Sequence, residues 1–345
     1  IEKLFQDDFN RIVLLSPRAD LSIKQAVCLQ ANMGLARFHR LLGFLIRSTN
    51  VRNAFELFDP VLRLARSLLD GNIKLVLSSE WEFSPFTFAQ VFPELPNFVF
   101  IGLPASESGN CLIVPLAGHE LGHTVWRTRG VGKGLENAIK QAVTDKVTHA
   151  WSEFEAIFGK NDPKKILTDL VLIARWGPAY NYCLRQCEET FCDFLGLRLF
   201  GESYLHSFEY LLAPNLGPRR EPRYPPLVQR AKHLVLAATK MGYSAPSDFS
   251  SRFIDAAPPS LPRADQFRIK ISDESTASLV EVLIAAVERY VAPLELSLPT
   301  TEGEAAILRS LAATVPAGTP SSLSDIINAG WRAMIDSNIW PIDRV

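Results

Sequence analysis

The sequence has few cysteines, no surplus of charge of either sign and no long uninterrupted apolar run. Five cysteines among 345 residues are too few, and odd in number, for a disulfide-stabilised scaffold. The 36 Lys and Arg residues balance 37 Asp and Glu residues, so no basic excess is available to neutralise nucleic-acid phosphates. The closest approach to a membrane span, residues 34–46, is broken by charged residues and falls short of the roughly 18 apolar residues required. We therefore expect neither a nucleic-acid nor a membrane partner.

Apolar and aromatic side chains, in contrast, are abundant. Hydrophobic residues make up 47% of the chain and include 21 Phe and 6 Trp, which excludes a disordered protein. The length is typical of roughly two domains. The first residues show no basic segment followed by an apolar one, so we expect no signal peptide and a cytoplasmic location.

The spacing of the apolar residues predicts an α+β fold that is predominantly helical, with one small sheet in the first half. The period changes from helical to strand-like after residue 72, and short strands are predicted over 73–77, 83–88 and 97–101. The segment 244–272 is irregular and rich in proline. Helices are predicted over 22–46, 51–69, 115–129, 135–158, 165–176, 179–200, 202–212, 227–241, 275–291, 302–313 and 322–336. The predicted regions are an N-terminal helical part over 1–72, a core over 73–243 that contains the sheet, and a C-terminal helical part over 244–345.

One motif carries chemistry, His119-Glu120-Leu121-Gly122-His123. Two histidines four residues apart lie on one face of a helix, so both imidazoles can reach a single Zn²⁺ ion. A glutamate next to the first histidine can act as general base toward a zinc-activated water. The sequence therefore predicts a zinc site with His119 and His123 as ligands and Glu120 as the catalytic base.

A third protein ligand must come from elsewhere in the chain. The pattern with glycine three and histidine six residues after the second histidine is absent, because Trp126 and Arg129 stand there. A later predicted helix carries Glu188, Glu189 and Asp193. Glu189 and Asp193 share one face, which favours Glu189 as ligand and Asp193 as the acceptor that orients a ligating imidazole. Glu188, about 100° away around the helix, is the alternative ligand.

These two motifs together resemble the gluzincin family of zinc metallopeptidases. The resemblance covers roughly residues 73–240 and implies a zincin-like catalytic core that hydrolyses a peptide bond. It implies His119, His123 and Glu189 as zinc ligands, with Glu120 acting as base and then as acid to the leaving amine. The chain departs from the thermolysin-like members in the long interval between the motifs, into which two helices are inserted.

Long-interval members of the family often carry a His-Pro segment with an arginine shortly after it. Here Tyr224 precedes the proline pair and Arg230 follows. Tyr224 is accordingly a candidate donor to the developing oxyanion, with His206, His233 and Tyr182 as alternatives, and packing of Tyr224 on the prolines is the other interpretation. Arg230 is expected to pair with a carboxylate near the site.

The sequence leaves three functions open. The first is peptide hydrolysis, the second is zinc-dependent hydrolysis of a non-protein amide, and the third is a non-catalytic scaffold or regulatory module that a zinc-binding helix stabilises. A strand over 97–103 is a candidate edge strand that would align an extended peptide substrate. The C-terminal helices are a candidate surface for a regulatory protein partner. The cysteines around Glu189 are expected to be small core side chains.

Overall fold

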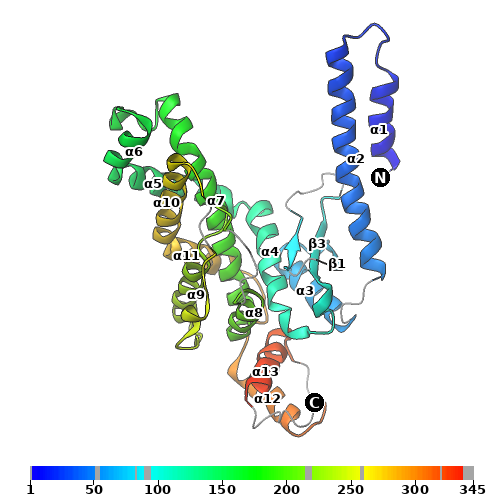
Figure 1. The fold of residues 1–345 in the computed structure, drawn as a ribbon. Coiled ribbons are helices and arrows are strands. Elements are labelled where there is room, and N and C mark those ends of the chain that lie inside the picture. The colour runs from blue at the N-terminus through cyan, green and yellow to red at the C-terminus, as the bar shows by residue number, and fades with distance from the viewer. Residues whose placement is uncertain are drawn as a thin grey trace.

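The computed structural model shows a predominantly helical α+β protein with one three-stranded sheet (Figure 1), which confirms the predicted fold class. It describes residues 2–50, 55–81, 84–88, 95–213, 220–256, 260–318 and 321–336. The strands are β1 (Lys74–Glu80), β2 (Phe86–Thr87) and β3 (Phe98–Pro104). The helices are α1 (Glu2–Val13), α2 (Leu21–Asn50), α3 (Phe58–Leu68), α4 (Pro115–Thr128), α5 (Val131–His149), α6 (Trp151–Phe158), α7 (Leu170–Phe200), α8 (Glu202–Leu212), α9 (Leu227–Met241), α10 (Arg263–Ser278), α11 (Val280–Val291), α12 (Thr301–Ala312) and α13 (Leu323–Ile335).

The sheet has the order β1–β3–β2, with β3 parallel to β1 and antiparallel to β2. Phe86 of β2 lies opposite Gly102 of β3, and a Cβ at Gly102 would approach the Phe86 ring to 2.6 Å. The missing side chain thus makes room for β2 on the flank of β3. The prediction that 97–103 forms an edge strand is therefore wrong, and β2 is the edge on that side. Residue 83, the first of the predicted strand 83–88, lies outside the described residues.

Alternate residues of β3 face different layers, as expected for a strand. Val99 and Ile101 belong to the main hydrophobic core together with α3 and α4. Phe100 points to the opposite face, where it packs with Phe44 of α2, their ring centroids 5.8 Å apart. The second half of α2 thus covers one face of the sheet, while α1 and the first half of α2 project from the body (Figure 1).

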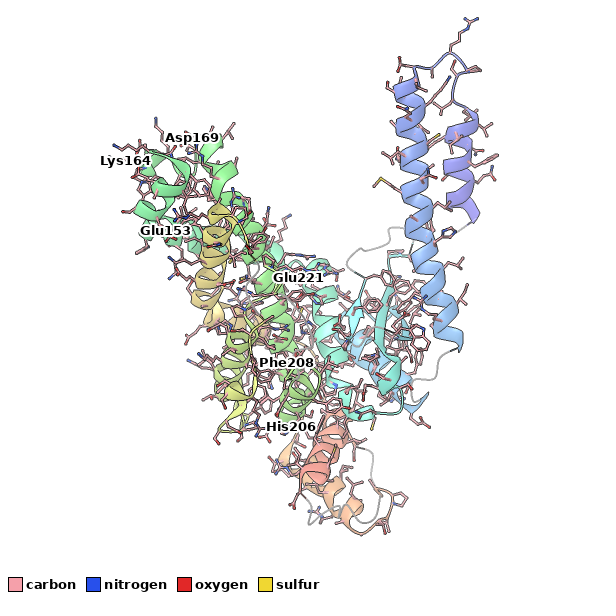
Figure 2. All side chains as sticks on the ribbon, viewed as in Figure 1. Glu153, Lys164, Asp169, His206, Phe208 and Glu221 are labelled. Atoms are coloured by element: carbon pink, nitrogen blue, oxygen red, sulfur yellow. The ribbon has the colours of Figure 1, made fainter. Side chains whose placement is uncertain are left out.

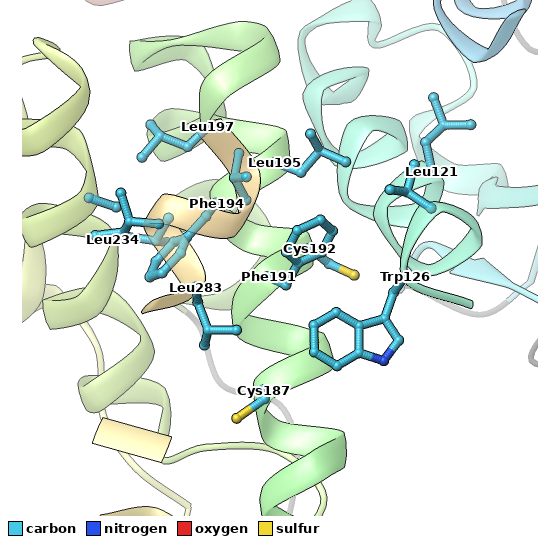
Figure 3. Packing of buried hydrophobic residues seen from close by; sticks show 14 of the residues in the cluster. Leu121, Trp126, Cys187, Phe191, Cys192, Phe194, Leu195, Leu197, Leu234 and Leu283 are labelled. Atoms are coloured by element: carbon cyan, nitrogen blue, oxygen red, sulfur yellow. The ribbon is translucent and has the colours of Figure 1, made fainter. Parts of the chain in front are cut away.

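The main core runs from Val61 in α3 to Val291 in α11, and so crosses both region boundaries predicted from the sequence. Those boundaries stay predictions as domain limits. The interface between α4 and α7 lies within this core (Figure 3), and Trp126 of α4 packs on Phe191 of α7 with the ring centroids 5.4 Å apart. Cys183, Cys187 and Cys192 are all buried, as the sequence predicted for them.

The helix α7 is continuous, so the predicted end at Gly177-Pro178 is wrong. Asp169 caps the helix by accepting from the amides of Val171 and Leu172, and Pro178 lies inside it. A proline removes one backbone hydrogen bond and leaves carbonyls of the preceding turn to find other donors. Arg268 of α10 donates to the carbonyl of Arg175, in the turn before Pro178, at 2.8 Å.

Two other predicted boundaries differ from the structure. The segment 135–158 is divided at Ala150 into α5 and α6, and α6 turns so that Phe154 meets Phe267 of α10. The helix α10 begins at Arg263, inside the segment predicted to be irregular. Its buried face contains Ser272, Ser275 and Thr276 besides Phe267 and Ile271, so the apolar period of a helix is weak in the sequence.

Across the described ranges we find no helix that combines the length and the apolar character needed to cross a bilayer.

The close approach of α4 and α7 at Gly122 can be tested by adding one methyl group. A Cβ at this position would lie 2.9 Å from the Cα of Cys192, so Gly122→Ala must push the two helices apart. We expect a loss of about 1–3 kcal/mol in the free energy of unfolding, the usual cost of overpacking.

The matched control is Gly134→Ala in α5, where a Cβ meets nothing within 4 Å. It should raise the free energy of unfolding by about 0.5–1 kcal/mol, because glycine is a poor helix former. Urea denaturation of both variants measures the effect, and equal stabilities would contradict the close packing of α4 on α7.

Candidate metal centre and cleft

The helix α4 presents its motif residues toward α7. It begins at Pro115, a favoured first helical residue, and packs between β3 and α7 (Figure 1). His119, Glu120 and His123 are all buried. Burial of three polar side chains on one helix requires partners, and α7 supplies most of them.

The Nε2 atoms of both histidines face one carboxylate, Glu189. His119 Nε2 lies 3.4 Å from Glu189 Oε2, and His123 Nε2 lies 3.7 Å from Glu189 Oε1. Tetrahedral zinc with ligands at about 2.1 Å would hold its ligand atoms roughly 3.4 Å apart. Each contact is close to that separation, the two contacts use different oxygens of Glu189, and the three side chains are of the types that zinc prefers.

The Nδ1 atoms of the two histidines are each held from behind by a carboxylate. His119 Nδ1–H donates to Asp193 Oδ1 at 2.9 Å, and His123 Nδ1–H donates to Glu188 Oε1 at 2.9 Å. Such contacts orient an imidazole and leave its Nε2 free for another partner. Glu188 and Glu189 therefore have different positions, with Glu188 behind His123 and Glu189 in front of both rings.

The carboxylate of Asp193 is the centre of a buried network. Arg230 donates to both of its oxygens, at 2.8 and 2.9 Å, and thus forms the ion pair expected near the site. Tyr204 also donates to Asp193 Oδ1, at 2.8 Å. Burial alone raises the pKa of Asp193, but the charge of Arg230 and the hydrogen bond from His119 outweigh it and hold the pKa well below its usual range.

Glu188 is held in the same way at the other end of the site. Arg127 of α4 and Arg185 of α7 donate to its two oxygens, at 2.7 and 2.5 Å. Burial raises the pKa of Glu188, but the hydrogen bond from His123 and the charge of Arg127 outweigh it and lower the pKa to about 2. The carboxylate is therefore ionised at neutral pH.

The sequence patterns did not lead us to Tyr204, Arg127 or Arg185. The two arginines stand four residues after His123 and four before Glu189, a spacing that could have revealed them. Tyr204 comes from α8, and its ring covers Gly196, where a Cβ would approach the ring to 2.3 Å. Its position depends on tertiary packing and carries no local signal.

Glu120 differs from the other carboxylates of the site. In the part of the chain that the structure describes, it accepts no hydrogen bond and forms no ion pair, although it is only 5% exposed. Burial raises its pKa, and the nearby histidines counteract this only in part. An unpaired buried carboxylate is costly and is typical of a functional position.

A cleft of about 740 Å³ opens over these residues. Its floor contains His119, Glu120, His123 and Glu189, and β2 contributes Phe86 and Thr87 to its wall. Tyr224 also lines the cleft, and Arg220 donates to its backbone carbonyl while pairing with Asp273. Burial and the negative charge of Glu189 raise the pKa of Tyr224, so its phenol keeps its proton at neutral pH.

The alternatives to Tyr224 do not line the cleft. His206 packs on Trp331 of α13, with the ring centroids 5.5 Å apart, and Figure 2 shows it at the lower part of α8, toward α13. His233 is buried and bonded to Gln229, and Tyr182 lies on α7 outside the lining. The oxyanion role of Tyr224 stays a prediction.

A second set of donors, His119, His123 and Cys192, could also hold a metal, because one ligand atom from each lies within 4.8 Å of the others. Cys192 is fully buried against Gly122, between the helices and away from the cleft lining (Figure 3). Burial and four neighbouring carboxylates raise the pKa of its thiol well above the usual range. We favour Glu189 over Cys192 because the oxygens of Glu189 face both Nε2 atoms from the cleft, whereas the sulfur of Cys192 packs against Gly122.

Metal uptake should release a proton from His119. Burial lowers the pKa of this histidine, but the hydrogen bonds with Asp193 and Glu189 outweigh it and raise the pKa to about 10. In the metal-free chain His119 is therefore protonated at pH 7.5, whereas a zinc-bound imidazole is neutral at the ligating nitrogen.

Calorimetric titration with zinc at pH 7.5, in buffers of different ionisation enthalpy, should give about one proton released per chain. Because the pKa of His119 in the metal-free chain is about 10, less of it is protonated as the pH rises toward 10, and the number of protons released should fall. A binding enthalpy that does not depend on the buffer would contradict this protonation state.

Comparison of the chain with known protein families, curated proteins and solved structures found no match.

Proposed function

We propose that the chain is a zinc metallopeptidase in which His119, His123 and Glu189 bind the metal. The observation that carries the proposal is the convergence of two imidazole Nε2 atoms on one carboxylate at the floor of a cleft. The carboxylates behind both imidazoles support it, because metal-binding histidines almost always have such partners. A bound zinc ion would supply a Lewis acid that lowers the pKa of water toward neutrality.

The chain's own residues would transfer the proton, stabilise the oxyanion and orient the imidazoles. Glu120 would accept the proton of the attacking water and pass it to the leaving amine, a role that suits its raised pKa. Tyr224 would donate its phenolic proton in a hydrogen bond to the oxygen that becomes negative. Asp193 and Glu188 would keep both imidazoles in the tautomer that directs Nε2 into the cleft.

The wall of the cleft favours a peptide over a small amide. The edge strand β2 lines it, and the outer edge of such a strand offers backbone groups with which an extended chain can pair. The substrate class, the zincin-like character of the core and the cytoplasmic location stay parts of this proposal. A regulatory partner at the C-terminal helices likewise stays a prediction.

The ligand set can be tested by metal content. The purified chain should hold one zinc ion, and Glu189→Gln should lose it, because a carboxamide cannot replace a charged ligand. Glu188→Gln should keep the ion but bind it about 10–100-fold more weakly, as expected for a group that orients a ligand.

Cys192→Ala is the matched control and should leave the affinity for zinc unchanged. Elemental analysis gives the stoichiometry, and competition with a chromophoric chelator gives the affinity. Loss of zinc from Cys192→Ala together with retention by Glu189→Gln would contradict the assignment.

The role of Glu120 separates an enzyme from a scaffold. Glu120→Gln should keep the zinc content and the thermal stability, but lower kcat/KM for hydrolysis of quenched fluorescent peptides by at least about 100-fold. Glu136→Gln, an exposed change on α5, is the control and should leave kcat/KM unchanged. If Glu120→Gln cleaved as fast as the parent, the proposed mechanism would be wrong.

A further inference from the structure

Arg127 and Arg185 flank the proposed zinc site at one end. Arg127 stands one turn after His123 on α4, and Arg185 stands one turn before Glu189 on α7. Both line the cleft. The two helices thus place their arginines next to each other in the cleft, one turn beyond the proposed ligands.

These two guanidinium groups share a single carboxylate. Arg127 Nη2 donates to Glu188 Oε1 at 2.7 Å, and Arg185 Nη1 donates to Glu188 Oε2 at 2.5 Å. Arg127 also donates to the carbonyl of Phe88 at 3.3 Å, which fixes it against the segment after β2. Glu188 also accepts from His123, so three donors share its two oxygens.

Among the described residues that line the cleft, the other two arginines each have a carboxylate of their own. Arg230 is neutralised by Asp193, and Arg223 pairs with Glu221 at 2.6 Å. Two arginines on one carboxylate leave a surplus of one positive charge. The other two carboxylates on the cleft floor, Glu120 and Glu189, face the proposed zinc site.

Arg185 has donors to spare. Its side chain is 45% exposed, and within the described ranges its contact with Glu188 is the one hydrogen bond it makes. A guanidinium has five N–H donors in a planar fork, which suits bidentate binding of a second carboxylate. The surplus charge and the spare donors occur on the same residue.

We infer that Arg127 and Arg185 form a subsite for a carboxylate of the substrate, an inference that rests on the proposed peptidase function. One helical turn rises about 5.4 Å, and an extended peptide advances about 3.3–3.6 Å per residue. The carboxylate therefore lies within about two residues of the bond that is cleaved. It is either an acidic side chain or the C-terminal carboxylate, because both present the same two oxygens.

Binding to the full-length Glu120→Gln chain, loaded with zinc, tests the subsite without turnover. The probes are fluorescein-labelled hexapeptide pools in two matched pairs. The two pools of the first pair differ by Glu or Gln at one internal position, which is varied in turn, and both have an amidated C-terminus. The two pools of the second pair have neutral side chains and differ by a free or an amidated C-terminus. We expect the charged member of one pair to bind at least about tenfold more tightly, as fluorescence polarisation would show.

Adding Arg185→Gln should abolish that difference, while adding Arg63→Gln should preserve it. Arg63 is an exposed arginine outside the cleft that also pairs with a single carboxylate, Asp59. In the chain with an intact Glu120, Arg185→Gln should raise KM for the charged peptides at least about tenfold more than KM for their neutral partners, a comparison in which any effect transmitted through Glu188 to the metal cancels.

The responsive pair identifies the source of the carboxylate. A difference between the Glu and Gln pools indicates an acidic side chain, and a difference between the free and amidated pools indicates a C-terminal carboxylate. No difference in either pair, or a difference that survives Arg185→Gln, would overturn the subsite.

The two proposals fail separately. If charged peptides bind through Arg185 but no peptide is cleaved by the parent chain, the peptidase proposal fails and the subsite stands. If neutral and charged peptides bind and are cleaved equally well, the subsite fails and the peptidase proposal stands.

Discussion

The contact between α4 and α7 at Gly122 is the constraint on which the site depends. Because Gly122 has no side chain, the backbone of α4 reaches the backbone of α7 at Cys192. Side chains within one turn of this contact are then close enough to interact directly, so His119 and His123 each meet a carboxylate of α7. The geometry of the candidate metal centre follows from the packing of two rigid helices rather than from a loop, which is how a precise constellation is best held.

Charge pairing continues outward from this contact in two layers. Asp193 and Glu188 orient the imidazoles, and arginines hold these carboxylates in turn: Arg230 on one side, Arg127 and Arg185 on the other. Each of these buried charges therefore has a partner, which offsets the cost of removing it from water. Both Nδ1 atoms are occupied by these hydrogen bonds. The groups left to act in the cleft are the two Nε2 atoms, the carboxylate of Glu189 that faces them and the unpaired carboxylate of Glu120.

Local sequence signals predicted much of this site, and tertiary packing supplied the rest. The helix of α4 and the face shared by Glu189 and Asp193 follow from helical periodicity. The contact of Glu188 does not, because two crossing helices bring residues about 100° apart on α7 against the same neighbour. Pro178 misled the prediction of α7 because proline normally ends a helix, whereas here α7 continues past it with Arg268 of α10 bonded to the carbonyl of Arg175. Tyr204 was missed because no local pattern reports a contact between helices.

The central claim is that two imidazoles and a carboxylate, with no sulfur, bind one zinc ion. X-ray absorption spectroscopy at the zinc edge of the loaded chain tests it most directly, because Zn–S and Zn–N/O shells differ in distance. We expect nitrogen and oxygen scatterers alone at about 2.0–2.2 Å, with the multiple-scattering pattern of two imidazoles. A sulfur shell near about 2.3 Å would place Cys192 in the coordination sphere and contradict the assignment of Glu189 as the third ligand.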